Sequence, residues 1–190
     1  MARKKQNFRK LEYLLRDEDT IEFNKYYIKH SKSGRKVVWQ QRMMIPAVIV
    51  GYVILMAIFK YNSKPVYFFG GVMVLAAIVY GFMAEKIVLN QQAKKIRDES
   101  NYWENIHREK TTLEFLDDQV DACYKGQKES FGYDTINKVS LTDKAIYIWL
   151  DEMVALQVPN SAFEIDSNKD ALFNFLSEKC VNAEIDTALK

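Results

Sequence analysis

Residues 43–59 read MMIPAVIVGYVILMAIF and residues 65–83 read PVYFFGGVMVLAAIVYGFM, and neither stretch contains a charged side chain. A helix needs about 20 mostly apolar residues to cross the hydrocarbon core of a bilayer, and interfacial aromatic residues can extend each stretch to that length. Both stretches are apolar on every side, whereas a helix at the surface of a soluble core is apolar on one side only. The sequence therefore predicts two transmembrane helices, at 43–61 and 65–83.

Only the short link KYNSK, residues 60–64, separates the two stretches. Because this link is too short to hold a domain, the two helices must form an antiparallel hairpin with both ends on one side of the membrane. Pro46 falls in the first turn of the first helix, where its missing N–H costs little. The hairpin is thus expected over residues 43–83.

Basic residues are concentrated on the side of the membrane where the two ends of the hairpin lie. They occur before the first helix at Lys25, Lys29, Lys32, Arg35, Lys36 and Arg42, and after the second at Lys86, Lys94, Lys95 and Arg97. The link carries only Lys60 and Lys64. Because positive residues near membrane spans stay in the cytoplasm, we expect a multi-pass protein of the cell membrane with both termini cytoplasmic.

The stretch KYYIKHSKSGRK, residues 25–36, is strongly basic and lies shortly before the first helix, and no acid occurs from Asn24 to Arg42. A leaflet rich in anionic lipid attracts such a segment by about 1 kcal/mol per basic residue near the surface. Nucleic acid is disfavoured as a partner, because the segment is tethered a few residues from the bilayer. Two roles remain open for the six basic residues before the first helix: contact with lipid headgroups, or a topology signal alone.

Small residues recur at a spacing of four in both helices. The pairs are Ala47 with Gly51 and Ala77 with Gly81. Small residues at this spacing let helix backbones approach closely in lipid. We expect the two pairs to face each other within the hairpin, although chance spacing and contact with a second copy of the chain remain open.

The segments on either side of the hairpin are expected to be partly helical. Apolar and polar residues alternate from Leu11 to Leu15, which suits a strand. The acidic run that begins at Asp17 indicates a turn or a helix start, because acids are favourable at a helix N-terminus. Residues 84–110 contain no Pro or Gly, so we expect the second helix to continue as a stalk.

From Thr111 onward, short runs rich in β-branched and aromatic residues alternate with turn-like sequences. The runs are TTLEFL, QVDACYK, ESFGY, INKVSL, AIYIWL and MVALQV, and such close spacing indicates a small antiparallel sheet or barrel. After Pro159, a sequence resembling a capping box at 167–170 begins an amphipathic helix. A helix over the open end of the strands would bury both apolar faces.

Together these patterns predict an α+β membrane protein. Strands followed by one helix are the pattern of a pleckstrin-homology-like (PH-like) fold. The expected divisions are an N-terminal cytoplasmic segment (1–42, with its basic juxtamembrane part at 24–42), the transmembrane hairpin (43–83), the helical stalk (84–110), the PH-like domain (111–181) and a tail (182–190).

Several stretches resemble the YcxB-like family of bacterial membrane proteins. They are FNKYYIKHSKSGRK before the hairpin and, in the strand-rich part, TLEFLDDQV (112–120), FGYDTINKV (131–139), IYIWL (146–150) and VPNSAF (158–163). The resemblance covers the chain from about Leu11 to Cys180 and implies a PH-like cytoplasmic domain on a helical hairpin. The family often has Pro-Lys-x-x-Phe where this chain has Pro159-Asn160-Ser161-Ala162-Phe163, so no role of that lysine is carried over. No known reaction is implied.

The sequence shows no signature of catalysis. The glycine spacing of a phosphate-binding loop is absent from KGQKES at 125–130, and neither G-x-S-x-G nor H-E-x-x-H occurs. Two isolated histidines and two isolated cysteines, Cys123 and Cys180, disfavour a zinc site or a disulfide scaffold. The two spans carry no ionisable residue for an ion pathway. We therefore expect no enzyme, cofactor, metal or small-molecule substrate.

Tyr147 and Trp149 alternate with Ile146, Ile148 and Leu150 in one predicted strand. If the strand is covered on one face only, the two aromatic side chains form an exposed surface suited to a protein partner or to the lipid interface. The alternative is that both faces of the strand are buried.

Three functions remain open on these grounds. The first is a non-enzymatic membrane protein whose cytoplasmic domain binds a protein partner or lipid, or associates with a second copy. The second is an immunity factor that protects against a membrane-active or secreted toxin. The third is an accessory subunit of a membrane enzyme or transporter, which would require a polar cluster that the sequence does not show.

Overall fold

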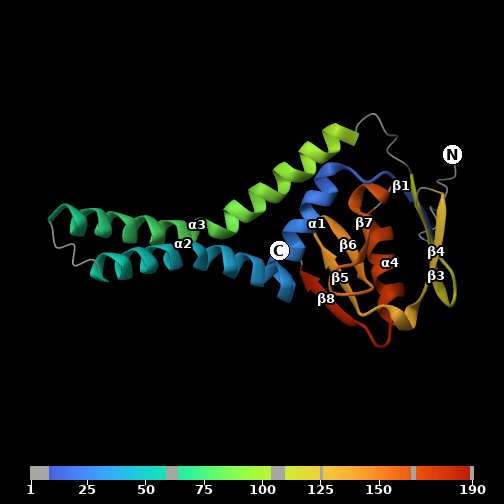
Figure 1. The fold of residues 1–190 in the computed structure, drawn as a ribbon. Coiled ribbons are helices and arrows are strands. Elements are labelled where there is room, and N and C mark those ends of the chain that lie inside the picture. The colour runs from blue at the N-terminus through green and yellow to red at the C-terminus, as the bar shows by residue number, and fades with distance from the viewer. Residues whose placement is uncertain (1–8, 59–63, 104–109, 125, 164–165, 189–190) are drawn as a thin grey trace. The chain divides into compact units, whose positions relative to one another are not determined.

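The computed structural model describes residues 9–58, 64–103, 110–124, 126–163 and 166–188. The chain forms two compact units. The β unit comprises Met1–Phe23 and Arg97–Lys190, and the helical unit comprises Asn24–Ile96. Figure 1 shows the order of the elements along the chain. Most of the expected link, residues 60–63, and the last part of the expected stalk, residues 104–109, lie outside the described residues.

Two long apolar helices, α2 (Lys32–Ile58) and α3 (Lys64–Trp103), make up most of the helical unit. Each contains a segment that is long and apolar enough to cross a membrane: Lys32–Met56 in α2 and Phe68–Asp98 in α3. The helices run antiparallel beside each other (Figure 1), and the side-chain amide of Gln41 donates a 2.5 Å hydrogen bond to the Tyr80 hydroxyl. The prediction of two long apolar helices is confirmed.

The contact between α2 and α3 is narrow. Positions that recur every three or four residues lie on one face of a helix, and the partly or fully buried positions follow this spacing on both helices. We call the following of these positions the contact stripe: Val38, Gln41, Ile45 and Ile49 on α2, with Met73, Ala77, Tyr80, Ala84 and Val88 on α3. The remaining apolar surface of both helices is largely exposed.

The helix before the hairpin, α1 (Asp17–His30), begins at the acidic run, as predicted. The Asp19 carboxylate accepts a hydrogen bond of 3.0 Å from the backbone N–H of Arg16. The acids in this first turn also complement the positive end of the helix dipole. The chain therefore enters α1 at the position that its acidic residues favour.

The first sheet of the β unit is antiparallel, with strand order β1-β2-β3-β4. Its strands are β1 (Lys10–Tyr13), β2 (Thr111–Phe115), β3 (Gln119–Tyr124) and β4 (Gln127–Gly132). β1 confirms the strand expected from the alternation at Leu11, and it pairs with β2, which lies some hundred residues later in the chain. The β unit therefore includes residues from before the hairpin and is wider than the expected domain of 111–181.

The second sheet has strand order β7-β6-β5-β8 and is mixed. Its strands are β5 (Lys138–Thr142), β6 (Ala145–Trp149), β7 (Ala155–Pro159) and β8 (Glu184–Ala188). β8 runs parallel to β5, whereas the other pairs are antiparallel. The expected tail, 182–190, thus contains a strand at Glu184–Ala188. Lys138 holds it, because its ammonium group lies 2.8 Å from the Glu184 carboxylate and 3.0 Å from that of Asp186.

The core of the β unit lies between the two sheets and α4 (Asp166–Lys179). Its fully buried side chains include Leu113 and Val120 of the first sheet, Ile146 and Ile148 of the second, and Leu172 and Leu176 of α4. The α4 lysines add hydrogen bonds to backbone carbonyls, from Lys169 to Thr142 (2.6 Å) and from Lys179 to Asp117 (2.8 Å). Two short 3₁₀ turns, Tyr133–Thr135 and Asn160–Ala162, complete the unit. The expected order of six strands and one helix from Thr111 is confirmed.

Candidate functional site

The six basic residues before the first predicted span lie on two helices. Lys25 and Lys29 are on α1, where Lys25 is half-buried and Lys29 is exposed. The other four, which we call the basic stripe, are exposed on α2: Lys32, Arg35, Lys36 and Arg42. The six residues therefore form two groups on different helices.

The basic stripe surrounds an exposed tryptophan. Side chains three or four residues apart are neighbours on a helix surface, so Trp39 lies between Arg35 and Lys36 on one side and Arg42 on the other. Trp39 is 60% exposed. Tryptophan is enriched at membrane–water interfaces, because its ring is amphipathic. This face of α2 combines positive charge with an aromatic side chain.

A tight corner between α1 and α2 positions the basic stripe. The Ser31 hydroxyl caps α2 by accepting a 2.8 Å hydrogen bond from the backbone N–H of Gly34. The backbone N–H of Ser31 donates to the Tyr27 carbonyl over 2.9 Å, which closes the end of α1. Ile28 packs with Val38 of α2 and with Val88 of α3. The KYYIKHSKSGRK sequence thus encodes a helix corner as well as a charge pattern.

The predicted small-residue contact is wrong for α2 and partly supported for α3. Ala47 and Gly51 are exposed, and a Cβ on Gly51 would meet no atom within 4 Å. Because each residue turns an α-helix by about 100°, Ala47 and Gly51 point to the side nearly opposite Ile49. Ile49 lies in the contact stripe. On α3, Ala77 is buried in the contact stripe, and a Cβ on Gly81 would lie 3.9 Å from Arg42 Cγ. The two predicted pairs therefore do not face each other.

Tyr147 and Trp149 do not form an exposed surface in the structure. They are only 2% and 7% exposed. The Phe23 ring packs on both of them, at centroid distances of 5.3 Å and 5.4 Å, and the Trp149 indole N–H donates a 3.2 Å hydrogen bond to the Ser140 hydroxyl. Strand β6 is therefore covered on both faces, by the core on one side and by Phe23 on the other.

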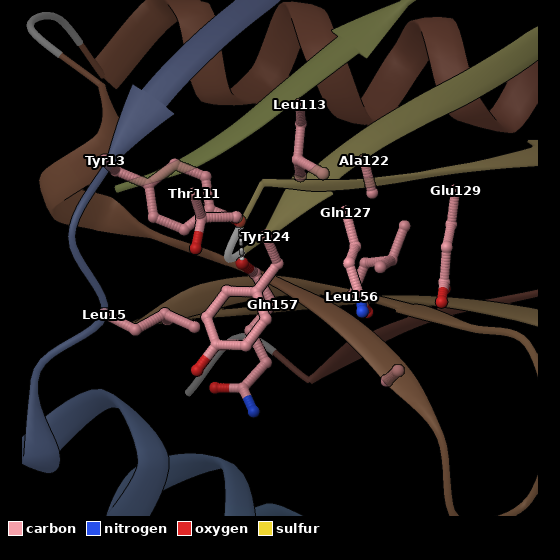
Figure 2. A pocket seen from close by; sticks show the side chains of 11 residues that line it. Tyr13, Leu15, Thr111, Leu113, Ala122, Tyr124, Gln127, Glu129, Leu156 and Gln157 are labelled. Atoms are coloured by element: carbon pink, nitrogen blue, oxygen red, sulfur yellow. Dashed lines mark hydrogen bonds between the residues drawn. The ribbon is translucent and has the colours of Figure 1, made fainter. Parts of the chain in front are cut away.

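A cavity of about 290 Å³ lies in the β unit between the inner face of the first sheet and strand β7. Its volume is close to the lower limit of small-molecule sites, roughly 300–1,000 Å³. Figure 2 shows the lining side chains, which come from both sheets and from the chain just after β1. Apolar walls are supplied by Leu15, Leu113, Ala122, Ala155 and Leu156.

Polar side chains occupy one end of this inner face, where the strand register brings them into a row. Tyr13 on β1 pairs with Thr111 on β2, and Tyr124 on β3 pairs with Gln127 on β4. The Tyr13 hydroxyl donates a hydrogen bond to the backbone carbonyl of Gln157 on β7. Burial raises the pKa of Tyr13 far above its ordinary value, so this hydroxyl stays protonated. The row lies beside β7 and forms the polar part of the cavity wall.

Two buried polar atoms in the cavity wall have no hydrogen-bond partner: Thr111 Oγ1 and Gln157 Oε1. Among the described residues, these are the buried side-chain nitrogen or oxygen atoms without a partner. The sequence patterns did not predict this site. The signal was nevertheless present, because alternation in TTLEF places Thr111 on the same face as Leu113 and Phe115, where a polar side chain is unexpected.

No group of three or more potential metal ligands occurs within the described residues. Both cysteines are free thiols; Cys123 is half-buried and Cys180 is buried. Burial raises the pKa of the Cys180 thiol to about 11. A thiol is a nucleophile or a ligand as the thiolate, so burial disfavours the reactive form of Cys180 near neutral pH.

Comparison of the chain with protein-family models, with curated proteins and with solved structures gives no match in any of the three. A function is therefore inferred from the residues of this chain alone.

Proposed function

We propose that this chain is a non-enzymatic integral membrane protein of the cell membrane. The α2–α3 hairpin spans the bilayer with both ends on the cytoplasmic side. The basic stripe contacts anionic lipid headgroups, and the β unit is a PH-like binding module for a protein or a lipid.

The observation that carries this proposal is the exposed apolar surface of α2 and α3. In the most apolar 18-residue window of each helix, only 11% and 17% of the residues are buried, whereas a core helix of a soluble protein is mostly buried. Large side chains such as Ile58, Phe68 and Phe82 are between 67% and 84% exposed. Monomeric soluble proteins rarely expose contiguous apolar patches beyond a few hundred Å², so a bilayer is the solvent that suits this surface.

The charge distribution on α2 supports the orientation and the lipid contact. The exposed basic residues lie toward the start of α2, and apolar residues follow them. Trp39 lies at the change from basic to apolar surface, as expected of an interfacial anchor. Each basic residue near an anionic surface contributes about 1 kcal/mol of attraction.

The architecture of the β unit supports a binding module. Its two sheets and the helix α4 follow the order of strands and helix that is typical of a PH-like domain. The resemblance to the YcxB-like family also implies a PH-like domain. The parallel strand β8 is an addition to that order.

Reporter fusions test the membrane insertion and its orientation. A green fluorescent protein fused to the C-terminus should fluoresce, and an alkaline phosphatase fused there should stay inactive. The chain should remain in the membrane pellet after an alkaline carbonate wash. An active phosphatase would contradict the orientation, and release by carbonate would contradict the spans.

Quenching of Trp39 fluorescence tests the lipid contact in the full chain, with Trp103 and Trp149 replaced by Phe. In nanodiscs, brominated anionic lipid should quench Trp39 more than brominated zwitterionic lipid at the same mole fraction. The combined substitution of Arg35, Lys36 and Arg42 by Gln should remove this difference. Lys144→Gln, which changes an exposed lysine between β5 and β6, should preserve it. An unchanged difference in the triple variant would show that the basic stripe serves topology alone.

A further inference from the structure

We propose that the cavity between the first sheet and β7 binds a small molecule that carries an N–H or O–H donor on an apolar body and has no negative charge. The site goes beyond the membrane role, because none of its lining residues belongs to the helical unit.

The cavity exists because β7 covers only part of the inner face of the first sheet. Leu113 and Ala122, which face each other across β2 and β3, supply an apolar floor at the covered part. At the other end, Tyr124 is 51% exposed and Gln127 and Glu129 are exposed, so the cavity opens toward solvent there. A ligand can enter past these side chains and place its apolar body against the floor.

The two buried oxygen atoms without a hydrogen-bond partner, Thr111 Oγ1 and Gln157 Oε1, indicate where the polar group of the ligand binds. Thr111 is only 7% exposed and its hydroxyl makes no hydrogen bond. The Gln157 side-chain oxygen is also buried and without a hydrogen bond. Buried polar atoms are nearly always paired, and leaving one unpaired is costly. Both residues line one cavity, so a ligand bound there lies beside both side chains and can supply the missing partners.

The chemistry of the wall restricts the charge of that ligand. Gln157 Oε1 can only accept a hydrogen bond, whereas the Thr111 hydroxyl can donate or accept. The ligand must therefore offer an N–H or O–H group to Gln157. The lining contains no Lys, Arg or His and one carboxylate, that of Glu129. An anion such as a phosphate headgroup would find no countercharge here, so a neutral or cationic amide, alcohol or amine fits better.

Ligand-observed fluorine NMR on the full chain in nanodiscs tests the proposal, with empty nanodiscs as the background. The probe is para-fluorobenzamide, a neutral donor on an aromatic body, and the matched anion is para-fluorobenzoate. We expect the benzamide to bind and the benzoate to bind at least about tenfold more weakly, the loss that corresponds to about one hydrogen bond. Equal binding of the two probes would overturn the charge restriction.

Two variants test whether binding occurs in this cavity. Thr111→Val removes the hydroxyl with little change in shape and should weaken benzamide binding about tenfold. The matched control is Thr112→Val, which changes the adjacent residue on the opposite face of β2 and should leave binding unchanged. Ala155→Leu, which fills the cavity from β7, should abolish binding and provides an independent test if Thr111→Val fails to fold. If benzamide does not bind, or binds all variants equally, the cavity holds water only and the proposal is wrong.

Discussion

A Cβ atom on Gly34 would lie 2.5 Å from Ile28 Cα, closer than real Cβ contacts allow. It would also lie 2.7 Å from the Tyr27 carbonyl oxygen and 2.8 Å from the Ser31 hydroxyl. The glycine is therefore required because the backbones of α1 and α2 touch at the corner. This contact sets the direction in which α2 leaves the corner with the basic stripe on its exposed face.

We predict that Gly34→Ala destabilises the helical unit. Two of the nearest atoms belong to the backbone and cannot move aside cheaply, so overpacking should cost about 1–3 kcal/mol. The measurement is the midpoint of helix loss during SDS titration of the purified chain, followed by circular dichroism. Gly51→Ala is the matched control, because its Cβ meets open space and alanine favours a helix. Equal midpoints for the two variants would show that the corner is not tightly packed.

Ser140→Ala should destabilise the β unit by about 1–3 kcal/mol, because it leaves the buried indole N–H of Trp149 without its acceptor. Urea unfolding followed by Trp149 fluorescence, with Trp39 and Trp103 replaced by Phe, measures the change. Ser177→Ala is the control, since that hydroxyl only donates to the Phe173 carbonyl within α4. A loss no larger than that of the control would contradict the assigned role of Ser140.

Asp121 should make the β3–β4 hairpin sensitive to acid. Hydrogen bonds from Lys128 and Ser130 hold the pKa of the Asp121 carboxyl below its ordinary value. A depressed pKa stabilises the fold above the unfolded-state pKa, and this contribution is lost as the pH falls through the folded-state pKa. The hydrogen-exchange protection factors of residues 119–132, which correct for the intrinsic pH dependence of exchange, should therefore fall below about pH 4.

The variant Asp121→Asn isolates this effect. Its protection factors at neutral pH should be lower than those of the wild type, and their further fall in acid should be smaller. Asp143→Asn, in the turn between β5 and β6, should behave like the wild type. The same acid response in Asp121→Asn and the wild type would assign the effect to other carboxylates.

The two thiols should react at different rates. Cys180 is 1% exposed and its pKa is raised by burial, whereas Cys123 is half-buried in β3. Iodoacetamide at about pH 8 should therefore modify Cys123 first in the native chain, and both residues after unfolding. Mass spectrometry of the digested protein gives the order. Faster labelling of Cys180 would show that α4 separates readily from the sheets.

Local patterns predicted the elements but not their partners. The acidic run at Asp17 and the alternation from Leu11 to Leu15 depend on neighbouring residues, so the start of α1 and strand β1 could be inferred from the sequence. The pairing of β1 with β2 and of β8 with β5 joins distant parts of the chain. No local period encodes such pairings, which explains why residues 182–190 were expected to be a tail.

The orientation of single side chains was the least predictable feature. Small-residue spacing identified Ala77 in the contact stripe, but the face of α2 that meets α3 depends on how the two helices are rotated in the structure. In the same way, alternation showed that Tyr147 and Trp149 share a face of β6. Whether that face is exposed depends on Phe23, which is distant in sequence.

The amino-acid sequence is sufficient to show that two helices of this chain are long and apolar enough to cross a membrane. It also determined the clustering of basic residues before them and the series of short strands beyond Thr111, because composition, charge and local periodicity act over a few residues. Tertiary packing was needed to show that Gly34 must be a glycine, that Trp149 is buried, and that Thr111 and Gln157 line one cavity. These properties depend on which distant segments pack together, since burial and hydrogen bonding are set by the whole fold.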